Sequence, residues 1–404
     1  MRLLLKIHFR QSVILLLVWI LLSACNELLP PDITNTPEIL PNQSTVEATL
    51  VSGQAGGTAI PPDTLASQAG ATPTTTAGSA PIGSGGLAIS DRYRLPYISG
   101  WGNGLITTTG KVWVGTANGM VEVLDAKSGQ VLQSIALFDG SGGMTQQVVF
   151  DLKYDGQHVW ALASSKKAAK PDTLFVIDTA SGTLLEQFDA SQWEGELDQK
   201  LGLSPGKIWA SHQSIDTSTF EVQYDVVPWG DSYAYDGKGW MWITGNTYVS
   251  DCNPVLSVVN ADDPSQHYAA WARDLHGDAC TKPITLIGDR MWVAVSAHPD
   301  NNTSAPALWA YPADGSKMTK ENHEPLVMVP SPDDDPITLI GDQDGLWLLA
   351  GNGYLYQFDP QTGALLNSLD LVGADKNTFT ANIAMDDHDL WVLMAQELLR
   401  IQLK

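Results

Sequence analysis

Two His-x-Asp pairs are the residues whose types and spacing suggest chemistry most directly. His276 is followed two positions later by Asp278, and His298 by Asp300, in two segments interpreted as neighbouring loops. Imidazole nitrogens and carboxylate oxygens together can bind a divalent cation or carry out acid–base catalysis. The four side chains therefore predict a metal site, with ordinary solvated loop residues as the alternative interpretation.

Further polar residues belong to the same predicted face. Asp333, Asp334 and Asp335 are consecutive carboxylates in the next loop, and His212 lies in an earlier one. We predict that these residues contribute to ligand binding. Carboxylates close to imidazoles repel one another, which favours a bound cation and raises the imidazole pKa values. A divalent cation is the only cofactor that this pattern indicates, and no catalytic residue can be assigned.

Two of the three cysteines are predicted to form a disulfide. Cys252 precedes the third strand of one predicted four-stranded unit, and Cys280 follows its fourth strand. Antiparallel strands bring these two ends together, and outside the cytoplasm a disulfide is the expected state of such a pair. A metal–thiolate site is the weaker alternative, because it would require further cysteines.

The elements that position these residues are clearest between Pro336 and Leu371. Four short apolar runs are separated by turn signals there, including Gly341-Asp342 and Asp359-Pro360-Gln361-Thr362-Gly363. In the latter turn, Pro presets φ and Gly accepts a positive φ. Four antiparallel strands in about 36 residues is the size of one β-propeller blade.

The same pattern recurs along the chain, and a Trp in the second strand marks each copy. The intervals are near the roughly 40–50 residues expected of propeller blades. A large ring at this position fills the space between neighbouring blades, so we interpret the Trp as a packing residue rather than a stacking platform for ligand. The copy around Trp209 is short, which predicts a degenerate blade. The seven marker residues are Trp113, Trp160, Trp209, Trp242, Trp292, Trp347 and Trp391.

The two ends of the repeat region complement each other. The last copy, around Trp391, contains only three strands, whereas Ile89 to Tyr97 reads as a strand that belongs to no copy. Placing this segment as the missing outer strand closes the ring and removes the open edge. The sequence therefore predicts an all-β fold, a seven-bladed β-propeller whose last blade is completed by an N-terminal strand.

A targeting segment precedes this region. Arg2, Lys6 and Arg10 form a basic start, and the apolar run from Ser12 to Leu22 is too short for a typical transmembrane helix. The run ends in Leu22-Ser23-Ala24-Cys25, which resembles the bacterial lipobox. That resemblance implies cleavage before Cys25 and acylation of its thiol and new amine. An ordinary secretory signal is the alternative.

The expected organisation is a lipoprotein signal peptide at 1–24, an anchor and disordered linker at 25–87, and the propeller at 88–404. The linker is rich in Thr, Pro, Gly and Ser and has no Lys or Arg from Asn26 to Leu87. Such a composition cannot bury enough apolar surface to offset chain entropy. The expected location is extracytoplasmic, anchored by lipid to the bacterial membrane or cell surface. The net charge of −23 argues against nucleic acid as a partner.

Three hairpin segments resemble the PQQ-like and YVTN-type propeller repeats. They are VEVLDAKSGQVLQSI, LFVIDTASGTLLEQF and YLYQFDPQTGALLNSL. The resemblance implies a propeller but not one activity. The adjacent-Cys pair of the quinoprotein dehydrogenases is absent here. The outer-membrane assembly lipoprotein usually has eight blades. Streptogramin-lyase-like propellers have seven, with a catalytic His and Mg²⁺.

Two functional classes follow from this resemblance and from the loop residues. The first is a surface-anchored binding or scaffolding module that holds a protein or small ligand through its loops, on the face conventionally called the top. The second is an extracytoplasmic lyase or hydrolase with an acidic, metal-dependent site on the same face. Long loops on a rigid scaffold are the usual position of a binding site, which favours the first class.

Overall fold

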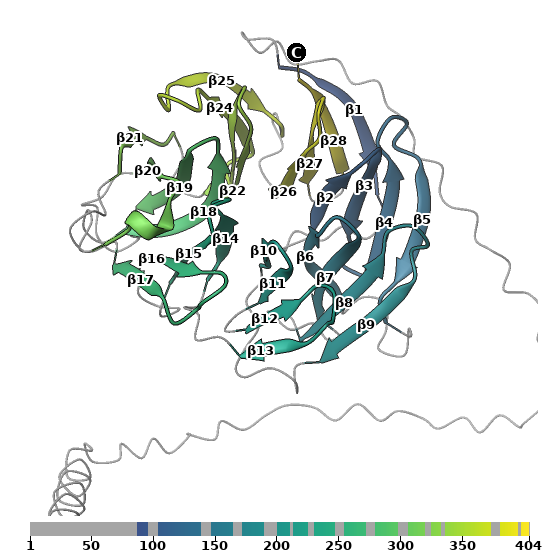
Figure 1. Ribbon diagram of the computed structural model, residues 1–404. Coiled ribbons are helices and arrows are strands. Elements are labelled where there is room, and N and C mark those ends of the chain that lie inside the picture. The colour runs from purple at the N-terminus through teal and green to yellow at the C-terminus, as the bar shows by residue number, and fades with distance from the viewer. Residues whose placement is uncertain are drawn as a thin grey trace, which may run out of the picture. The chain divides into compact units, whose positions relative to one another are not determined.

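The computed structural model describes residues 87–95, 104–138, 147–164, 172–189, 200–210, 213–224, 230–246, 254–271, 279–297, 306–319, 325–332, 336–372, 380–394 and 397–403. The chain separates into two units, Met1–Ser67 and Gln68–Lys404, and all of these residues belong to the second unit. Their strands form seven antiparallel sheets of four strands each. The sheets are arranged as blades around a central opening (Figure 1).

Six blades consist of consecutive strands, with the first strand nearest the centre and the fourth outermost (Figure 1). They are β2(Leu105–Thr108), β3(Lys111–Gly115), β4(Met120–Asp125) and β5(Val131–Ala136) in blade 1; β6(Val148–Tyr154), β7(His158–Ser164), β8(Thr173–Asp178) and β9(Leu184–Asp189) in blade 2; and β10(Gly202–Ser204), β11(Lys207–Ala210), β12(Gln213–Asp216) and β13(Val222–Tyr224) in blade 3. The next three are β14(Ser232–Tyr235), β15(Trp240–Asn246), β16(Pro254–Asn260) and β17(His267–Trp271) in blade 4; β18(Ala279–Ile287), β19(Arg290–Ala297), β20(Ala307–Pro312) and β21(Val327–Pro330) in blade 5; and β22(Pro336–Gly341), β23(Leu346–Ala350), β24(Tyr354–Phe358) and β25(Leu365–Asp370) in blade 6.

Blade 7 combines strands from both ends of the described region, in the order β1(Ile89–Arg94), β28(Glu397–Gln402), β27(Asp389–Met394) and β26(Thr380–Met385). In the register of β1 and β28, Tyr93 lies opposite Leu398. The guanidinium of Arg92 also lies 2.8 Å from the carboxylate of Glu397. The predicted closure by an N-terminal strand is therefore confirmed.

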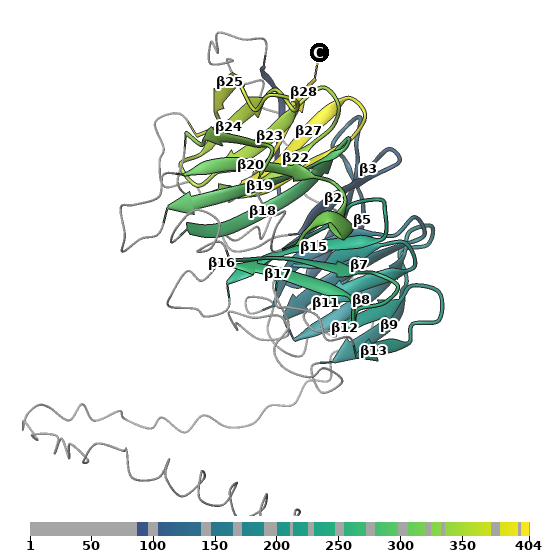
Figure 2. The same cartoon turned by 60° about the vertical axis from the view of Figure 1, so that its left-hand side comes forward.

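The second strand of each blade is the most buried, because neighbouring blades cover both of its faces (Figure 2). All five residues of β23 are buried, whereas the outermost strand β25 exposes half of the Leu366 side chain. The seven marker Trp side chains are at most 2% exposed, which confirms that they are packing residues. The blade around Trp209 has all four strands, although β10 and β13 contain only three residues each.

Seven hydrophobic clusters fill the seven junctions between blades. The cluster that joins blade 7 to blade 1 packs Trp391 and Leu398 against Val112 and Leu124. The ring is therefore closed by the same kind of packing at every junction, as expected when each repeat stabilises its neighbours. The short helix η3(Gly315–Lys317) lies between β20 and β21. Within the described residues, no helix is long and apolar enough to cross a membrane.

Candidate functional site

The antiparallel strands divide the connections between two faces of the ring. Turns between first and second strands, and between third and fourth strands, lie on one face, which we call the turn face. Connections between second and third strands, and between successive blades, lie on the opposite loop face. The turn-face connection from Thr108 to Lys111 is short, whereas the loop-face connections from Ala136 to Val148 and from Ala297 to Ala307 are longer.

The site residues predicted from the sequence lie outside the described residues. Ala279 and Ala297, which adjoin Asp278 and His298 in sequence, pair at one end of blade 5. The metal site and the additional ligand-binding residues stay predictions. The residues concerned are His212, His276, Asp278, His298, Asp300, Asp333, Asp334 and Asp335.

The backbone of Cys280 corrects one detail of the predicted disulfide. Cys280 was expected in a loop after the fourth strand of blade 4, but its backbone belongs to β18, the first strand of blade 5, opposite Ser296. Backbone pairing with β19 continues on both sides of Pro283, with a register shift between Thr281 and Ile284. Cys252 and Cys25 lie outside the described residues, so the disulfide and the lipid anchor stay predictions.

On the turn face, most core Trp side chains donate a hydrogen bond to a polar residue before the second strand. The Trp160 indole nitrogen lies 2.8 Å from Asp155 Oδ2, and that of Trp391 lies 3.0 Å from Asp386 Oδ2. The pKa of Asp155 is below its usual value. Burial alone would raise this pKa, but the hydrogen bonds that the carboxylate accepts, the largest from Trp160, outweigh that effect. An acceptor five residues before the Trp is the sequence signal for this bond.

The turn between the third and fourth strands of one blade covers the preceding blade. Lys207 Nζ lies 3.0 Å from the carbonyl oxygen of Ala261 in the next blade's turn. Trp292 Nε1 lies 3.2 Å from the carbonyl oxygen of Pro360, which is the same arrangement between blades 5 and 6. A hairpin turn of the following blade therefore accepts hydrogen bonds from the blade before it.

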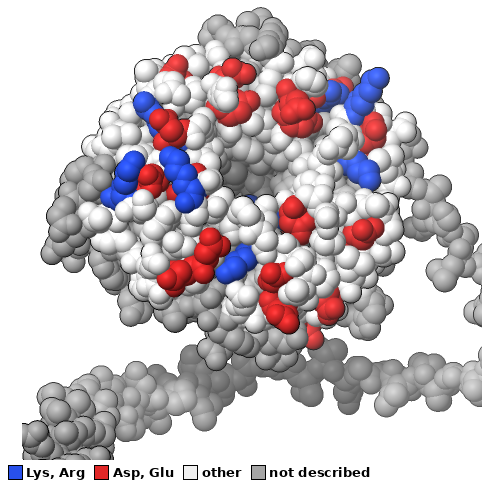
Figure 3. Space-filling model, viewed as in Figure 1, with Lys and Arg blue, Asp and Glu red and all other residues white. Residues whose placement is uncertain are grey.

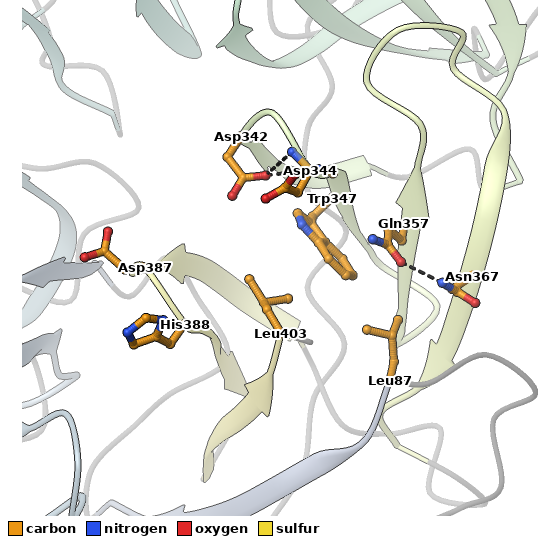
Figure 4. A pocket seen from close by; sticks show the side chains of 10 residues that line it. Leu87, Asp342, Asp344, Trp347, Gln357, Asn367, Asp387, His388 and Leu403 are labelled. Carbon is orange, nitrogen blue, oxygen red and sulfur yellow. Dashed lines mark hydrogen bonds between the residues drawn. The ribbon is translucent and has the colours of Figure 1, made fainter.

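The junction between blades 6 and 7 lacks such a turn, because β28 and β1 are not consecutive in the chain. An open pocket of about 490 Å³ lies there, which we call the seam pocket (Figure 4). Its apolar surface comes from the Trp347 ring, from Leu403 after β28 and from Leu87 before β1. The pocket thus lies between two strand ends that a hairpin turn joins in the other blades.

The polar groups of the seam pocket come from both blades. Asp342 and Asp344 belong to the turn between β22 and β23, whereas Asp387 and His388 belong to the turn between β26 and β27. In Figure 4, Leu403 lies between the Asp387–His388 pair and the Trp347 ring. The pocket is therefore acidic. Nowhere in the described part of the chain do three or more His, Cys, Asp or Glu gather as metal ligands.

Trp347 differs from the other six marker residues. Its side chain is 2% exposed, but no described residue accepts a hydrogen bond from its Nε1–H, whereas each of the other six has an acceptor. Asp342 occupies the acceptor position, and its Oδ1 instead lies 2.9 Å from the backbone nitrogen of Asp344 and 3.0 Å from that of Gly345. No local feature of the sequence predicts this pocket.

Comparison with known proteins identifies the architecture. No protein-family model and no curated protein matches the chain. A chain in the "Crystal Structure of Mitotic Checkpoint Complex" is similar, with a TM-score of 0.58 and 15% identity, over 78% of this chain and 93% of that one. At this identity the similarity shows the fold alone. The protein is therefore a seven-bladed β-propeller.

Proposed function

We propose that this protein is an extracytoplasmic binding module, anchored to a bacterial membrane by lipid on Cys25, that holds a protein or small ligand on its loop face. The observation that carries the proposal is the asymmetry of the ring, whose longer connections leave one face of a closed scaffold. Binding residues are found most often on such loops, because the scaffold fixes their positions.

Several observations support this role. Propellers are compatible with protein binding, and the similar solved chain belongs, by its title, to a complex. Leu22-Ser23-Ala24-Cys25 and the linker that follows favour a tethered protein. The face in Figure 3 carries separate acidic and basic side chains around a central hollow, rather than one continuous charged patch.

Two finer features belong to the same proposal. The hairpin sequences support membership of the PQQ-like or YVTN-type repeats, and a Cys252–Cys280 disulfide would connect blade 4 to blade 5 beside the loop face.

A divalent cation held by His276, Asp278, His298 and Asp300 would order the loops of this face. Calorimetric titration with Ca²⁺, Mg²⁺, Zn²⁺ and Mn²⁺ tests the cation, and His276→Ala with His298→Ala should abolish the heat.

Site-specific photo-crosslinking in cells tests the loop face against the turn face. Ala136 and Gln130 are exposed at the two ends of β5, Ala136 on the loop face and Gln130 on the turn face. A photoreactive residue at Ala136, or at exposed Pro330 on the same face, should give several-fold more of one discrete crosslinked product than at Gln130. Equal or stronger crosslinking from Gln130 would contradict binding on the loop face.

A further inference from the structure

We infer that the seam pocket is a second binding site, which holds a short peptide segment with a Lys or Arg side chain. In this arrangement the cationic group lies in the field of Asp342, Asp344 and Asp387, and a peptide carbonyl accepts the Trp347 Nε1–H bond. The pocket lies on the turn face, so the inference is independent of the proposed role of the loop face.

At four other junctions, peptide of the next blade's turn lies where the seam pocket lies between blades 6 and 7. Carbonyl oxygens of the next blade's turn accept hydrogen bonds from Lys111, Lys207, Trp292 and Arg400, at 3.0 to 3.3 Å. Between blades 6 and 7 no hairpin turn provides these carbonyls, because β28 and β1 come from distant parts of the chain. A peptide segment from another molecule has the shape and the acceptors that are absent here.

The charge of the seam pocket is the reverse of that at three other junctions, those after blades 1, 3 and 5. Lys111, Lys207 and Arg290 stand two residues before their Trp, and each donates to a carbonyl of the next blade. Gly345 occupies this position in blade 6, and an added Cβ would lie only 2.9 Å from Trp347 Nε1. The protein thus supplies carboxylates in place of a basic group. A fitting ligand must carry the positive charge itself.

Trp347 indicates that the ligand also carries a hydrogen-bond acceptor. A donor that a ligand covers without offering an acceptor costs about 1–3 kcal/mol, so a fitting ligand presents an acceptor to it. The side chain of Trp347 is 98% buried, but its Nε1–H is accessible from the open pocket and meets no acceptor among the residues that the structure describes. A ligand carbonyl at the position that Pro360 takes beside Trp292 would satisfy it.

The size and the sequence restrict the occupant further. A volume of about 490 Å³ is within the range of small-ligand sites, roughly 300–1,000 Å³, and accommodates one long side chain with its adjoining peptide groups. The segment that precedes Leu87 has no Lys or Arg back to Asn26, so it lacks the required charge. The occupant is therefore a basic peptide of another molecule.

Calorimetry on the full-length protein in detergent tests the inference with three probes at low salt. N-acetylated, C-amidated Gly-Lys-Gly should bind, and the same peptide with norleucine in place of Lys should bind at least tenfold more weakly. Protonated n-butylamine, which has the alkylammonium but no peptide groups, should also bind more weakly than the lysine peptide. Equal affinity for the norleucine peptide would overturn the requirement for a cation, and equal affinity for n-butylamine would overturn the requirement for a peptide carbonyl.

Variants of the seam-pocket residues test whether the lysine peptide binds in this pocket. Asp344→Asn with Asp387→Asn should weaken the lysine peptide at least tenfold, whereas Asp262→Asn, an exposed carboxylate in the turn of blade 4, should leave its affinity unchanged. Trp347→Phe keeps a smaller aromatic ring, removes the Nε1–H donor and should weaken binding about fivefold. Lys404→Ala should have no effect. Unchanged affinity in the Asp344, Asp387 double variant, or much tighter binding after Lys404→Ala, would overturn the inference.

Discussion

Arg400 is the side chain that connects the last blade to the first. Its Nη2 lies 2.6 Å from Asp389 Oδ2, its Nη1 lies 3.1 Å from the carbonyl oxygen of Lys127 in blade 1, and its guanidinium lies 5.6 Å from the Trp391 ring centroid. The hydrogen bond with Asp389 is the largest of the effects that raise the pKa of Arg400. Asp389 is only 3% exposed, so Arg400 is the partner that compensates its burial.

Arg400→Met should therefore destabilise the propeller by about 3–5 kcal/mol, because it leaves the buried Asp389 carboxylate unpaired. Urea unfolding measures the free energy of unfolding. Arg92→Met is the matched control, because its ion pair with Glu397 is partly exposed and should contribute at most about 1 kcal/mol. Similar losses in both variants would show that the Arg400–Asp389 pair has no special role.

The turn carboxylates predict a loss of stability in acid. Hydrogen bonds lower the pKa of Asp216 to about 2, and the largest contribution comes from the Ser218 hydroxyl. The pKa of Asp155 is also lowered, because the hydrogen bonds that it accepts outweigh the effect of burial. Unfolded Asp has a pKa of about 3.9, so the unfolded chain binds more protons below that pH. The contribution of Asp216 is thus complete above about pH 5 and is lost as the pH falls from about 4 to about 2.

Melting temperatures between pH 7 and pH 2 test this expectation. The Tm should stay nearly level down to about pH 5 and then fall. Asp155→Asn should lower the Tm at pH 7, because the bond from Trp160 weakens, and should also reduce the fall in acid. An Asp155→Asn variant with the same acid dependence as the wild-type protein would contradict the assignment.

At the scale of elements, β1 is the strand on which closure of the ring depends. It pairs with β28, and Tyr93 packs its ring 5.9 Å from the Trp391 ring at the junction with blade 1. Burial is the main cause that raises the pKa of Tyr93. The strand therefore both pairs with the edge of β28 and contributes a side chain to the core.

Deletion of Ile89–Arg94 should lower the free energy of unfolding by several kcal/mol, because it removes the pairing of a whole strand and exposes an edge. Tyr93→Ala alone should cost about 3–5 kcal/mol as a large-to-small core change. Deletion of residues 26–76 is the control and should leave the Tm unchanged. If the β1 deletion melts like the control, closure does not depend on β1.

A Cys252–Cys280 disulfide would act between two elements. Cys280 belongs to β18 of blade 5, and Cys252 directly precedes blade 4's β16 in sequence, so the bond would connect two blades. For the loop between Cys252 and Cys280, the chain-entropy relation gives a stabilisation of the folded state of about 3–4 kcal/mol. Thiol labelling of the unfolded, unreduced protein should find neither cysteine reactive. Two labelled thiols would refute the bond.

For the whole molecule, attachment to the membrane is predicted to depend on one residue. Cys25→Ser should abolish incorporation of labelled lipid and release the protein from the membrane fraction, since the apolar run from Ser12 to Leu22 is too short for a typical transmembrane helix. The propeller itself should keep its Tm. A variant that stays in the membrane fraction after a high-salt wash would contradict the lipobox interpretation.

The blades were predictable because their signals are local. A turn such as Asp359 to Gly363 and a Trp in every second strand depend only on neighbouring residues, so the repeat reveals seven blades and the unassigned strand Ile89–Arg94. The end of a strand is less predictable, and β18 therefore includes Cys280, which the sequence analysis expected in a loop. Backbone pairing with β19 overrides the local Pro283 signal there.

The seam pocket could not be predicted in this way, because it exists only between blades. The turn from Asp342 to Gly345 resembles the other turns of the chain in sequence and was interpreted as one of them. Its difference arises from its neighbour. Closure of the ring brings Leu87 beside Leu403, and no hairpin turn covers Trp347. Local periodicity is sufficient to specify each blade, whereas an open junction is a property of the closed ring, which only the tertiary structure defines.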